Sequence, residues 1–282
     1  MPTDDPWHKS RNRSQRDGHR AAPAADLASA SPQPARREQR QREQRLFGIN
    51  ACLAVFAHRR SAIRKVYLVE AVMPRMRAVL AWCASERVGY RLVAAEDLRK
   101  LTGSEHHEGV CFDTLAAPEQ ELDTFLPTLA SQKRSWLAWL EGVGNPHNFG
   151  AILRSAAHFG CAGVLLSRES PLTLSGAAAR VAEGGAESVP IVRFDSAATA
   201  LSTLRRQHFQ TIASVVRGGD DLFAARLAPR VVLLMGAEGD GLAPAIAAGC
   251  DLSLAIPGSG AVESLNVSAA FAVFAARIAA PG

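Results

Sequence analysis

Apolar and polar residues alternate along the second half of the chain in blocks that favour strands and helices in turn. Short runs rich in Val, Leu and Ile are typical of buried strands. They cover residues 136–140, 163–166, 190–194, 211–216, 231–235 and 252–256. Patterns of helical period cover residues 151–159, 176–182, 196–208, 243–248 and 264 to the end. Strands that alternate with helices predict an α/β domain with a parallel sheet, covered on both faces, over residues 134–282.

A shorter set of elements comes before this domain. Helices are expected at residues 49–57 and 74–85 and around Leu98, and strands at 65–69, 90–93 and 109–112. These elements predict a small α/β domain over residues 46–115. Residues 116–133, with two prolines and several acidic residues, are predicted to form the inter-domain linker. Residues 1–45 have neither a strand nor a helix period in their first 35 positions and are predicted to be a disordered basic tail.

Charge is distributed unevenly among these parts. The tail holds ten basic and six acidic side chains, residues 46–117 hold ten and seven, and residues 118–282 hold twelve and fourteen. The basic charge of the tail and small domain predicts that these parts contact a polyanion such as RNA. The alternative is a solvated tail without a partner. The five cysteines form no C-x-x-C pair, which favours reduced thiols in the cytoplasm. Neither a signal peptide nor a membrane span is evident.

The first candidate functional segment is G-V-G-N-P-H-N-F-G-A-I-L-R-S-A-A-H-F-G, which runs from Gly142 to Gly160. Asn148 is the predicted cap of a helix that Gly160 ends. Arg154 lies in the second turn among apolar neighbours, so the helix is expected to be largely buried. Because a buried arginine is usually paired with an anion, Arg154 is a candidate anion-binding residue. The alternative is an ordinary surface arginine.

Two more candidate segments follow later strands. G-A-E-G-D-G-L (236–242) allows a ligand to approach the backbone closely, although a plain glycine turn would have the same pattern. S-L-N-V-S (264–268) opens the last helix, and Ser264 is either its cap or a pocket residue. Since ligands bind at the carboxyl ends of strands in open α/β sheets, both loops should line one pocket. His106 and His107 are either exposed loop residues or contacts to RNA or a metal, but no further ligand lies at metal-binding spacing.

In this order and spacing, the three segments resemble the three motifs of the SpoU/TrmH family of RNA ribose 2′-O-methyltransferases, in the SPOUT superfamily. The resemblance covers Trp136 to the C-terminus and is carried by N-P-H-N-F-G-A-I-L-R-S-A, M-G-A-E-G-D-G-L and I-P-G-S-G-A-V-E-S-L-N-V-S-A-A. Residues 46–114 resemble the family's small RNA substrate-binding domain. That domain commonly has His-Gln-Gly where this chain has His107-Glu108-Gly109, so an acid replaces the amide.

The resemblance implies a deep trefoil knot, a homodimer and S-adenosyl-L-methionine as the cofactor, without a metal. It implies that the cofactor is held by the second and third motifs, with Glu238 shaping the loop and Gly236, Ile256 and Leu265 as the binding residues. The implied reaction is attack of a ribose 2′-hydroxyl of tRNA or rRNA on the sulfonium methyl group. Arginine is a poor general base, so Arg154 is interpreted as an anchor for the substrate phosphate. The resemblance implies Arg154, Asn148, Ser264 and Asn266 as the catalytic residues.

Two alternatives belong to other functional classes. One is an inactive RNA-binding or ribosome-assembly factor with the same fold, which would bind the cofactor but methylate no RNA. The other is a nucleotide-dependent oxidoreductase on a doubly wound sheet. The oxidoreductase is disfavoured because His147 stands where a dinucleotide fingerprint needs its third glycine. The identity of the RNA, the modified nucleotide and any general base stay open at this level.

Overall fold

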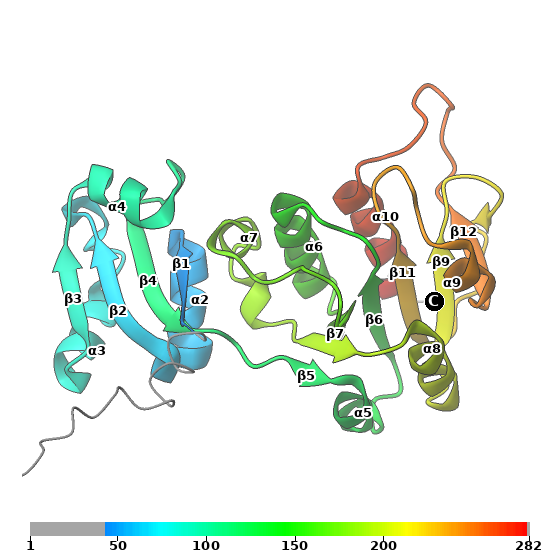
Figure 1. Cartoon of the computed structure of the whole chain (residues 1–282), viewed down its shortest axis with the longest axis horizontal. Coiled ribbons are helices and arrows are strands. Elements are labelled where there is room, and N and C mark those ends of the chain that lie inside the picture. Colours follow the sequence, from blue (N-terminus) through cyan, green and yellow to red (C-terminus); the bar gives the residue numbers. More distant parts are fainter. Residues whose placement is uncertain (1–42, 281–282) are drawn as a thin grey trace, which may run out of the picture.

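The computed structural model describes residues 43–280, which form a four-stranded and an eight-stranded sheet (Figure 1). Residues 1–42 of the predicted tail lie outside the described residues. The last three tail positions are not part of a tail, because they belong to the first strand, β1 (Glu43–Phe47). This strand pairs antiparallel with β4 along its whole length, from Glu43 opposite Leu115 to Phe47 opposite Cys111.

The small domain has the α/β composition that the pattern predicts. Its other strands are β2 (Ile63–Leu68), β3 (Gly89–Leu92) and β4 (Val110–Leu115), in the sheet order β1-β4-β2-β3. Its helices are α2 (Ile49–Arg59), α3 (Arg77–Glu86) and α4 (Ala95–Thr102), with short 3-10 turns η1 (Arg60–Ala62) and η2 (Glu70–Val72). Helices α2 and α3 bury Val55 and Val79 against one face of the sheet, and α4 buries Leu98 against the other.

The large sheet is parallel at every pairing within the described residues, as predicted. Its order is β10-β12-β9-β11-β6-β7-β8-β5. The strands are β5 (Gln120–Glu121), β6 (Ser135–Leu140), β7 (Gly163–Ser167), β8 (Ile191–Phe194), β9 (Gln210–Ser214), β10 (Asp220–Asp221), β11 (Arg230–Met235) and β12 (Leu252–Ala255). The helices and 3-10 turns are α5 (Leu122–Phe125), η3 (Leu126–Leu129), α6 (Pro146–His158), α7 (Gly176–Val181), η4 (Gly185–Glu187), α8 (Ala197–Arg206), α9 (Pro244–Ala248) and α10 (Val267–Ala279).

Two apolar cores lie on the two faces of this sheet. Alternate residues of β6 point to opposite sides, so Ala138 and Leu140 join the core under α6 and α10, whereas Leu137 and Trp139 join the core under α5 and α8. Figure 1 shows α6 and α10 on one side of the strands and α8 on the other. Burial on both faces explains why each strand reads as a continuous apolar run.

The segment predicted to be a linker is partly folded onto the large sheet. Residues 120–129 form β5, which pairs with β8, followed by α5 and η3. Leu122, Phe125, Leu126 and Leu129 are buried in the second core. Their helical spacing was obscured by Pro127 and by the acidic residues around it, because these are also typical of linkers.

The two domains are in contact through β1 and α2 on one side and α7 and η4 on the other. Arg59 of α2 donates from Nη2 to Glu187 Oε1 at 2.9 Å and from Nη1 to the Leu115 carbonyl at 2.8 Å. Both side chains of the Arg59–Glu187 pair are largely shielded, at 17% and 4% exposure. Gly48 lies directly against the side chain of Arg180, where a Cβ atom would be 2.8 Å from Cγ. Ala179 of α7 is buried in the apolar core of the small domain. The domains therefore pack against each other through a close-fitting interface with both polar and apolar contacts.

The five cysteines are free thiols, in agreement with the prediction of reduced cysteines. Burial raises the pKa of the Cys161 thiol to about 12, so it stays protonated and unreactive at neutral pH. Within residues 43–280, no three His, Cys, Asp or Glu side chains gather as a metal site would require. No helix in the same part of the chain is both long and apolar enough to span a bilayer.

Candidate functional site

Three loops meet at the carboxyl edge of the large sheet. They follow β6, β11 and β12, which lie close together in the sheet order β12-β9-β11-β6 and run in the same direction. The three loops contain the three candidate segments of the sequence. The parallel pairing therefore brings together residues that are more than a hundred positions apart, at the edge where open α/β sheets bind ligands.

A hydrogen-bonded cluster of Asn148, Glu238 and Asn266 links one residue from each loop. Glu238 Oε1 accepts a hydrogen bond from Asn148 Nδ2 and another from Asn266 Nδ2, both at 2.9 Å. Asn266 Nδ2 also donates to Asn148 Oδ1 at 3.1 Å. We refer to these three side chains as the amide–carboxylate cluster. It fixes the relative positions of the loops because each side chain belongs to a different segment of the chain.

The helix caps differ from those that the sequence predicted. Asn145, not Asn148, caps α6, since its Oδ1 accepts from the His147 N–H at 2.8 Å and Pro146 occupies the first helical position. The pair Asn-Pro carries this signal, because proline favours the first turn and asparagine the position before it. The cap moves the start of the helix back by five residues. Asn148 then lies inside the first turn, 9% exposed, with its amide free to reach Glu238.

The last helix, by contrast, begins later than predicted. Its cap is Asn266, whose Oδ1 accepts from the Ser268 N–H at 2.9 Å, and the helix starts at Val267. Asn266 therefore caps α10 with its oxygen and joins the amide–carboxylate cluster with its nitrogen. Ser264 is exposed and is not the cap. Within the described residues, it makes no side-chain hydrogen bond.

The loop after β11 is a tight hairpin. Ala237 and Gly241 exchange two backbone hydrogen bonds, both at 3.1 Å. Gly236 is buried beneath this hairpin, where a Cβ atom would overlap the backbone of Gly241 and Leu242. The packing of the loop itself therefore requires glycine at position 236, whereas the sequence pattern suggested the close approach of a ligand. Gly239 and Gly241 have φ angles of 90° and 69°, which favour glycine.

Arg154 is exposed, so the argument from its expected burial is wrong. Its neighbours Ile152 and Leu153 are buried, but Arg154 lies on the outward side of α6. Six residues of helix place it roughly 240° around the axis from Asn148, and no hydrogen bond or ion pair joins it to any residue in 43–280. Its guanidinium group is therefore free to bind an anion that does not belong to the described chain.

The loop after β12 presents its backbone to solvent. Residues 257–266 are exposed, Ile256 is half-buried, and Leu265 is 48% exposed. In the described chain, the backbone N–H groups of residues 258–265 donate no hydrogen bond except that of Ala261, which contacts Ser259 Oγ at 3.3 Å. A loop with so many free donors can hold a ligand through its backbone.

The start of β12 is anchored by Asp251. Its Oδ2 atom accepts from the backbone N–H and from the hydroxyl of Thr211, both at 2.8 Å. Burial acts to raise the pKa of Asp251, but the hydrogen bonds from Thr211 and the charge of Arg205 outweigh it and lower the pKa. The ionised carboxylate thus fixes the strand that leads into the third loop.

The two adjacent histidines of the small domain have different environments. His106 is exposed, whereas His107 is 8% exposed and its Nδ1 accepts from the Gly109 N–H at 3.0 Å. The interpretation as a pair of exposed loop histidines is therefore wrong for His107. Glu108 has a positive φ of 55°, and its Oε2 accepts from the Ile49 N–H at the start of α2, at 2.9 Å. The acid at this position thus stabilises the helix start, a role that the sequence pattern did not reveal.

Both domains match models of RNA methyltransferase domains. Residues 136–276 match the SpoU rRNA Methylase family, and residues 45–120 match the domain described as RNA 2′-O ribose methyltransferase substrate binding. The fold and the site thus define a methyltransferase with a separate domain for its RNA substrate. The chain belongs to the SpoU rRNA methylase family.

Relatives with similar sequences extend over most of the chain. A protein of Escherichia coli O157:H7 named as an uncharacterized tRNA/rRNA methyltransferase, YfiF, is 37% identical over 84% of this chain and 68% of its own length. The 23S rRNA (guanosine-2′-O-)-methyltransferase RlmB of Haemophilus influenzae is 30% identical over 82% of this chain and 94% of its own length.

A solved structure confirms the fold. The SpoU methyltransferase AviRb from Streptomyces viridochromogenes, solved in complex with AdoMet, superposes with a TM-score of 0.70. It is 20% identical and covers 85% of this chain and 90% of its own. Family membership confirms the resemblance drawn from the three motifs and sets aside the oxidoreductase alternative.

Proposed function

We propose that this protein transfers a methyl group from S-adenosyl-L-methionine to a ribose 2′-hydroxyl of RNA, and that the amide–carboxylate cluster organises the loops that bind the cofactor. The observation that carries the proposal is the cluster itself, because it ties together the three segments that characterise the family. Relatives named as RNA 2′-O-methyltransferases and neighbours solved with AdoMet support it. S-adenosyl-L-methionine supplies an electrophilic methyl group on a sulfonium.

The residues at the site fit this cofactor. The loop after β12 offers free backbone N–H groups, and a Cβ atom at Gly239, Gly241, Gly258 or Gly260 would meet nothing within 4 Å, so the backbone is open to a ligand there. Ile256 and Leu265 provide apolar surface beside these groups. Glu238 holds the loop after β11 in place through the two asparagine amides. Gly236 acts indirectly, by allowing the hairpin to fold.

Arg154 is proposed to hold the substrate. Its exposed and unpaired guanidinium can grip a phosphate through two parallel hydrogen bonds, which positions the 2′-hydroxyl for in-line attack. Asn148 and Asn266 are proposed to act by positioning the loops around the reacting groups, and Ser264 is an exposed hydroxyl at the same edge. Much of the rate of such a transfer can come from positioning alone.

A homodimer is the arrangement in which we expect the site to be complete. Arg154 faces away from the amide–carboxylate cluster of its own chain, so a second copy is a natural source of the arginine for each site. Mixing Arg154→Ala with a variant that is expected not to bind the cofactor, Gly236→Ala, tests this idea. If each site combines residues of two copies, mixed dimers should restore roughly a quarter of the wild-type activity, since half of the dimers contain one intact site. No restoration would mean that Arg154 acts within its own chain.

The function is tested by transfer of tritiated methyl groups to RNA from cells that lack the gene, followed by mapping of 2′-O-methylated positions. Transfer to one position that is unmodified in those cells would identify the target as tRNA or rRNA. An enzyme that binds the cofactor and methylates neither RNA would support the alternative of an inactive RNA-binding factor. The trefoil knot, the cytoplasmic location and the independence from metal stay predictions.

A further inference from the structure

A cavity of about 440 Å³ lies between the two domains. Its walls come from β1, the end of α4 and the α4–β4 loop of the small domain, and from the start of α6 and from α7 in the large domain. The lining includes Arg45, His106, His147 and Arg180, and no aspartate or glutamate is among the described residues that line it. This inter-domain cleft is therefore suited to a negatively charged ligand with a flat ring.

The charge of this cleft distinguishes it from another cavity of the molecule. A space of about 520 Å³ beside β3 is lined by Glu70, Asp97 and Arg91, so carboxylates outnumber the guanidinium. That balance disfavours RNA, whose phosphates would meet the two acids at close range. The inter-domain cleft combines a suitable volume with a cationic lining.

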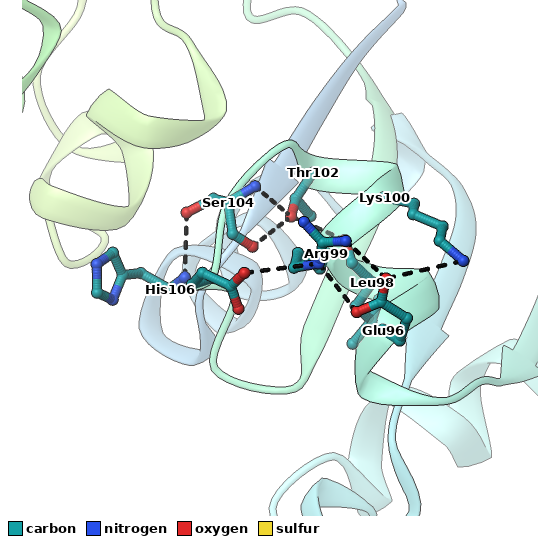
Figure 2. Close-up of polar contacts among 8 residues, drawn as sticks. Glu96, Leu98, Arg99, Lys100, Thr102, Ser104 and His106 are labelled. Atoms are coloured by element: carbon teal, nitrogen blue, oxygen red, sulfur yellow. Dashed lines mark hydrogen bonds and ion pairs between the residues drawn. The ribbon is translucent and has the colours of Figure 1, made fainter.

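The loop that presents His106 is held by its own hydrogen bonds. Thr102 Oγ1 donates to the Leu98 carbonyl at 2.8 Å, and the His106 N–H donates to Ser104 Oγ at 3.1 Å. Figure 2 shows the His106 ring directed away from α4, on the side where the ribbon of the large domain lies. A fixed loop with a projecting imidazole provides a stacking surface at little entropic cost.

Both arginines of the cleft are kept in place by acids that lie outside its lining. Arg45 Nε contacts Asp113 Oδ1 at 2.7 Å, and Nη1 donates to the Leu101 carbonyl at 2.8 Å. The hydrogen bond to Asp113 raises the pKa of Arg45 further, and an arginine is charged at neutral pH in any case. Arg180 Nη1 lies 3.7 Å from Glu108 Oε1. Neither partner uses all the donors of its arginine, so both guanidinium groups can contact a phosphate.

Helix α6 contributes both to the cleft and to the candidate catalytic site. His147, on its wall, precedes Asn148 of the amide–carboxylate cluster. Two consecutive Cα atoms are only about 3.8 Å apart. Because consecutive side chains of a helix point about 100° apart, the cleft and the cluster border neighbouring faces of α6.

We propose that the inter-domain cleft binds one unpaired nucleotide of the substrate RNA, next to the nucleotide that is methylated. Its base stacks on His106, and its phosphate contacts Arg45 and Arg180. Proteins commonly recognise unpaired RNA bases by stacking them on aromatic rings, including histidine, and the volume lies within the range of small-ligand sites. The inference rests on the proposed RNA methylation, and it makes His106 a substrate-binding residue.

The experiment compares the full-length wild type with His106→Ala, His106→Phe and a matched control, His58→Ala, which removes another exposed histidine of the small domain. The probe is a fluorescein-labelled, single-stranded RNA of mixed sequence, measured by anisotropy. We expect His106→Ala to weaken binding about tenfold, because stacking on one ring has an effect of this order. His106→Phe should stay within about threefold of wild type, since it keeps an aromatic face, and His58→Ala should bind normally.

Two results would overturn the proposal: wild-type RNA affinity in His106→Ala, or an equal loss in His58→Ala. Cofactor titration and melting temperature should be the same in all four proteins. A wild type that binds RNA through His106 but transfers no methyl group would leave the cleft established and refute the proposed function. Conversely, unchanged kcat/KM of His106→Ala on an RNA that the wild type methylates would leave the function established and refute the cleft.

Discussion

Replacement of Glu238 by alanine tests whether the amide–carboxylate cluster organises the cofactor loops. The change removes the acceptor shared by Asn148 and Asn266, whose bonds to Glu238 are both 2.9 Å long. Hydrogen bonds to a charged group contribute about 1.5–3 kcal/mol each when shielded. Glu238 is exposed, so water will replace part of this contribution, and we expect about 1–2 kcal/mol for the two bonds together.

This magnitude gives two measurable expectations. The melting temperature should fall by roughly 2–8 °C, since about 1 kcal/mol corresponds to 2–4 °C in a protein of this size. Cofactor affinity should fall roughly tenfold. A loss of about 1.4 kcal/mol lowers the population of the binding-competent loop about tenfold, and the apparent affinity falls by the same factor. Differential scanning fluorimetry and isothermal titration calorimetry measure the two quantities. Glu238→Gln keeps one acceptor oxygen without the charge and should show about half of each effect.

Asp240→Ala is the matched control. Asp240 is an exposed acid of the same hairpin, and within residues 43–280 it makes no hydrogen bond or ion pair. We expect it to change neither the melting temperature nor the affinity. If Glu238→Ala binds S-adenosyl-L-methionine as tightly as Asp240→Ala does, the cluster does not organise the cofactor loops and the reasoning is refuted.

Three further changes test other parts of the molecule. Arg154→Ala should lose most methyl transfer with normal cofactor affinity and stability. Arg154→Lys should recover only a small part of the rate, because lysine lacks the planar fork of the guanidinium group. Nearly full activity of the lysine variant, measured by tritium transfer, would contradict this. Gly236→Ala should prevent the hairpin from closing and abolish cofactor binding by calorimetry, whereas Gly89→Ala, with open space around it, should not. Arg59→Ala should destabilise the shielded pair with Glu187 by about 1–3 kcal/mol in urea titration, while Arg99→Ala, at an exposed pair, should cost well under about 1 kcal/mol.

The secondary structure could largely be predicted from the sequence. All six predicted strands of the large domain are present, and the predicted parallel sheet is confirmed. Hydrophobic periodicity is a local property that each strand and helix carries by itself, which is why it could be read directly. The short strands β5 and β10 were missed, since two residues each are too few to show a pattern.

Helix boundaries depended on details of capping that the pattern left ambiguous. Both Asn145 and Asn148 are suitable caps by residue type. Pro146 favours Asn145, and the hydrogen bond that the His147 N–H donates to Asn145 Oδ1 identifies it as the cap. The expected burial of Arg154 was wrong for a related reason. Apolar neighbours show that a helix packs against something, but the direction of one side chain depends on which face that contact covers.

The sequence by itself determined the α/β class, the order of the elements and the three segments that define the family, because these depend on residue types at short spacing. Only the tertiary structure decided which side chains of those segments meet. Asn148 and Glu238 are 90 positions apart, and Asn148 and Asn266 are 118 apart. Their contact follows from the order of parallel strands in the sheet, and the cleft beside His106 follows from the packing of two domains. Both are long-range arrangements that no local pattern encodes.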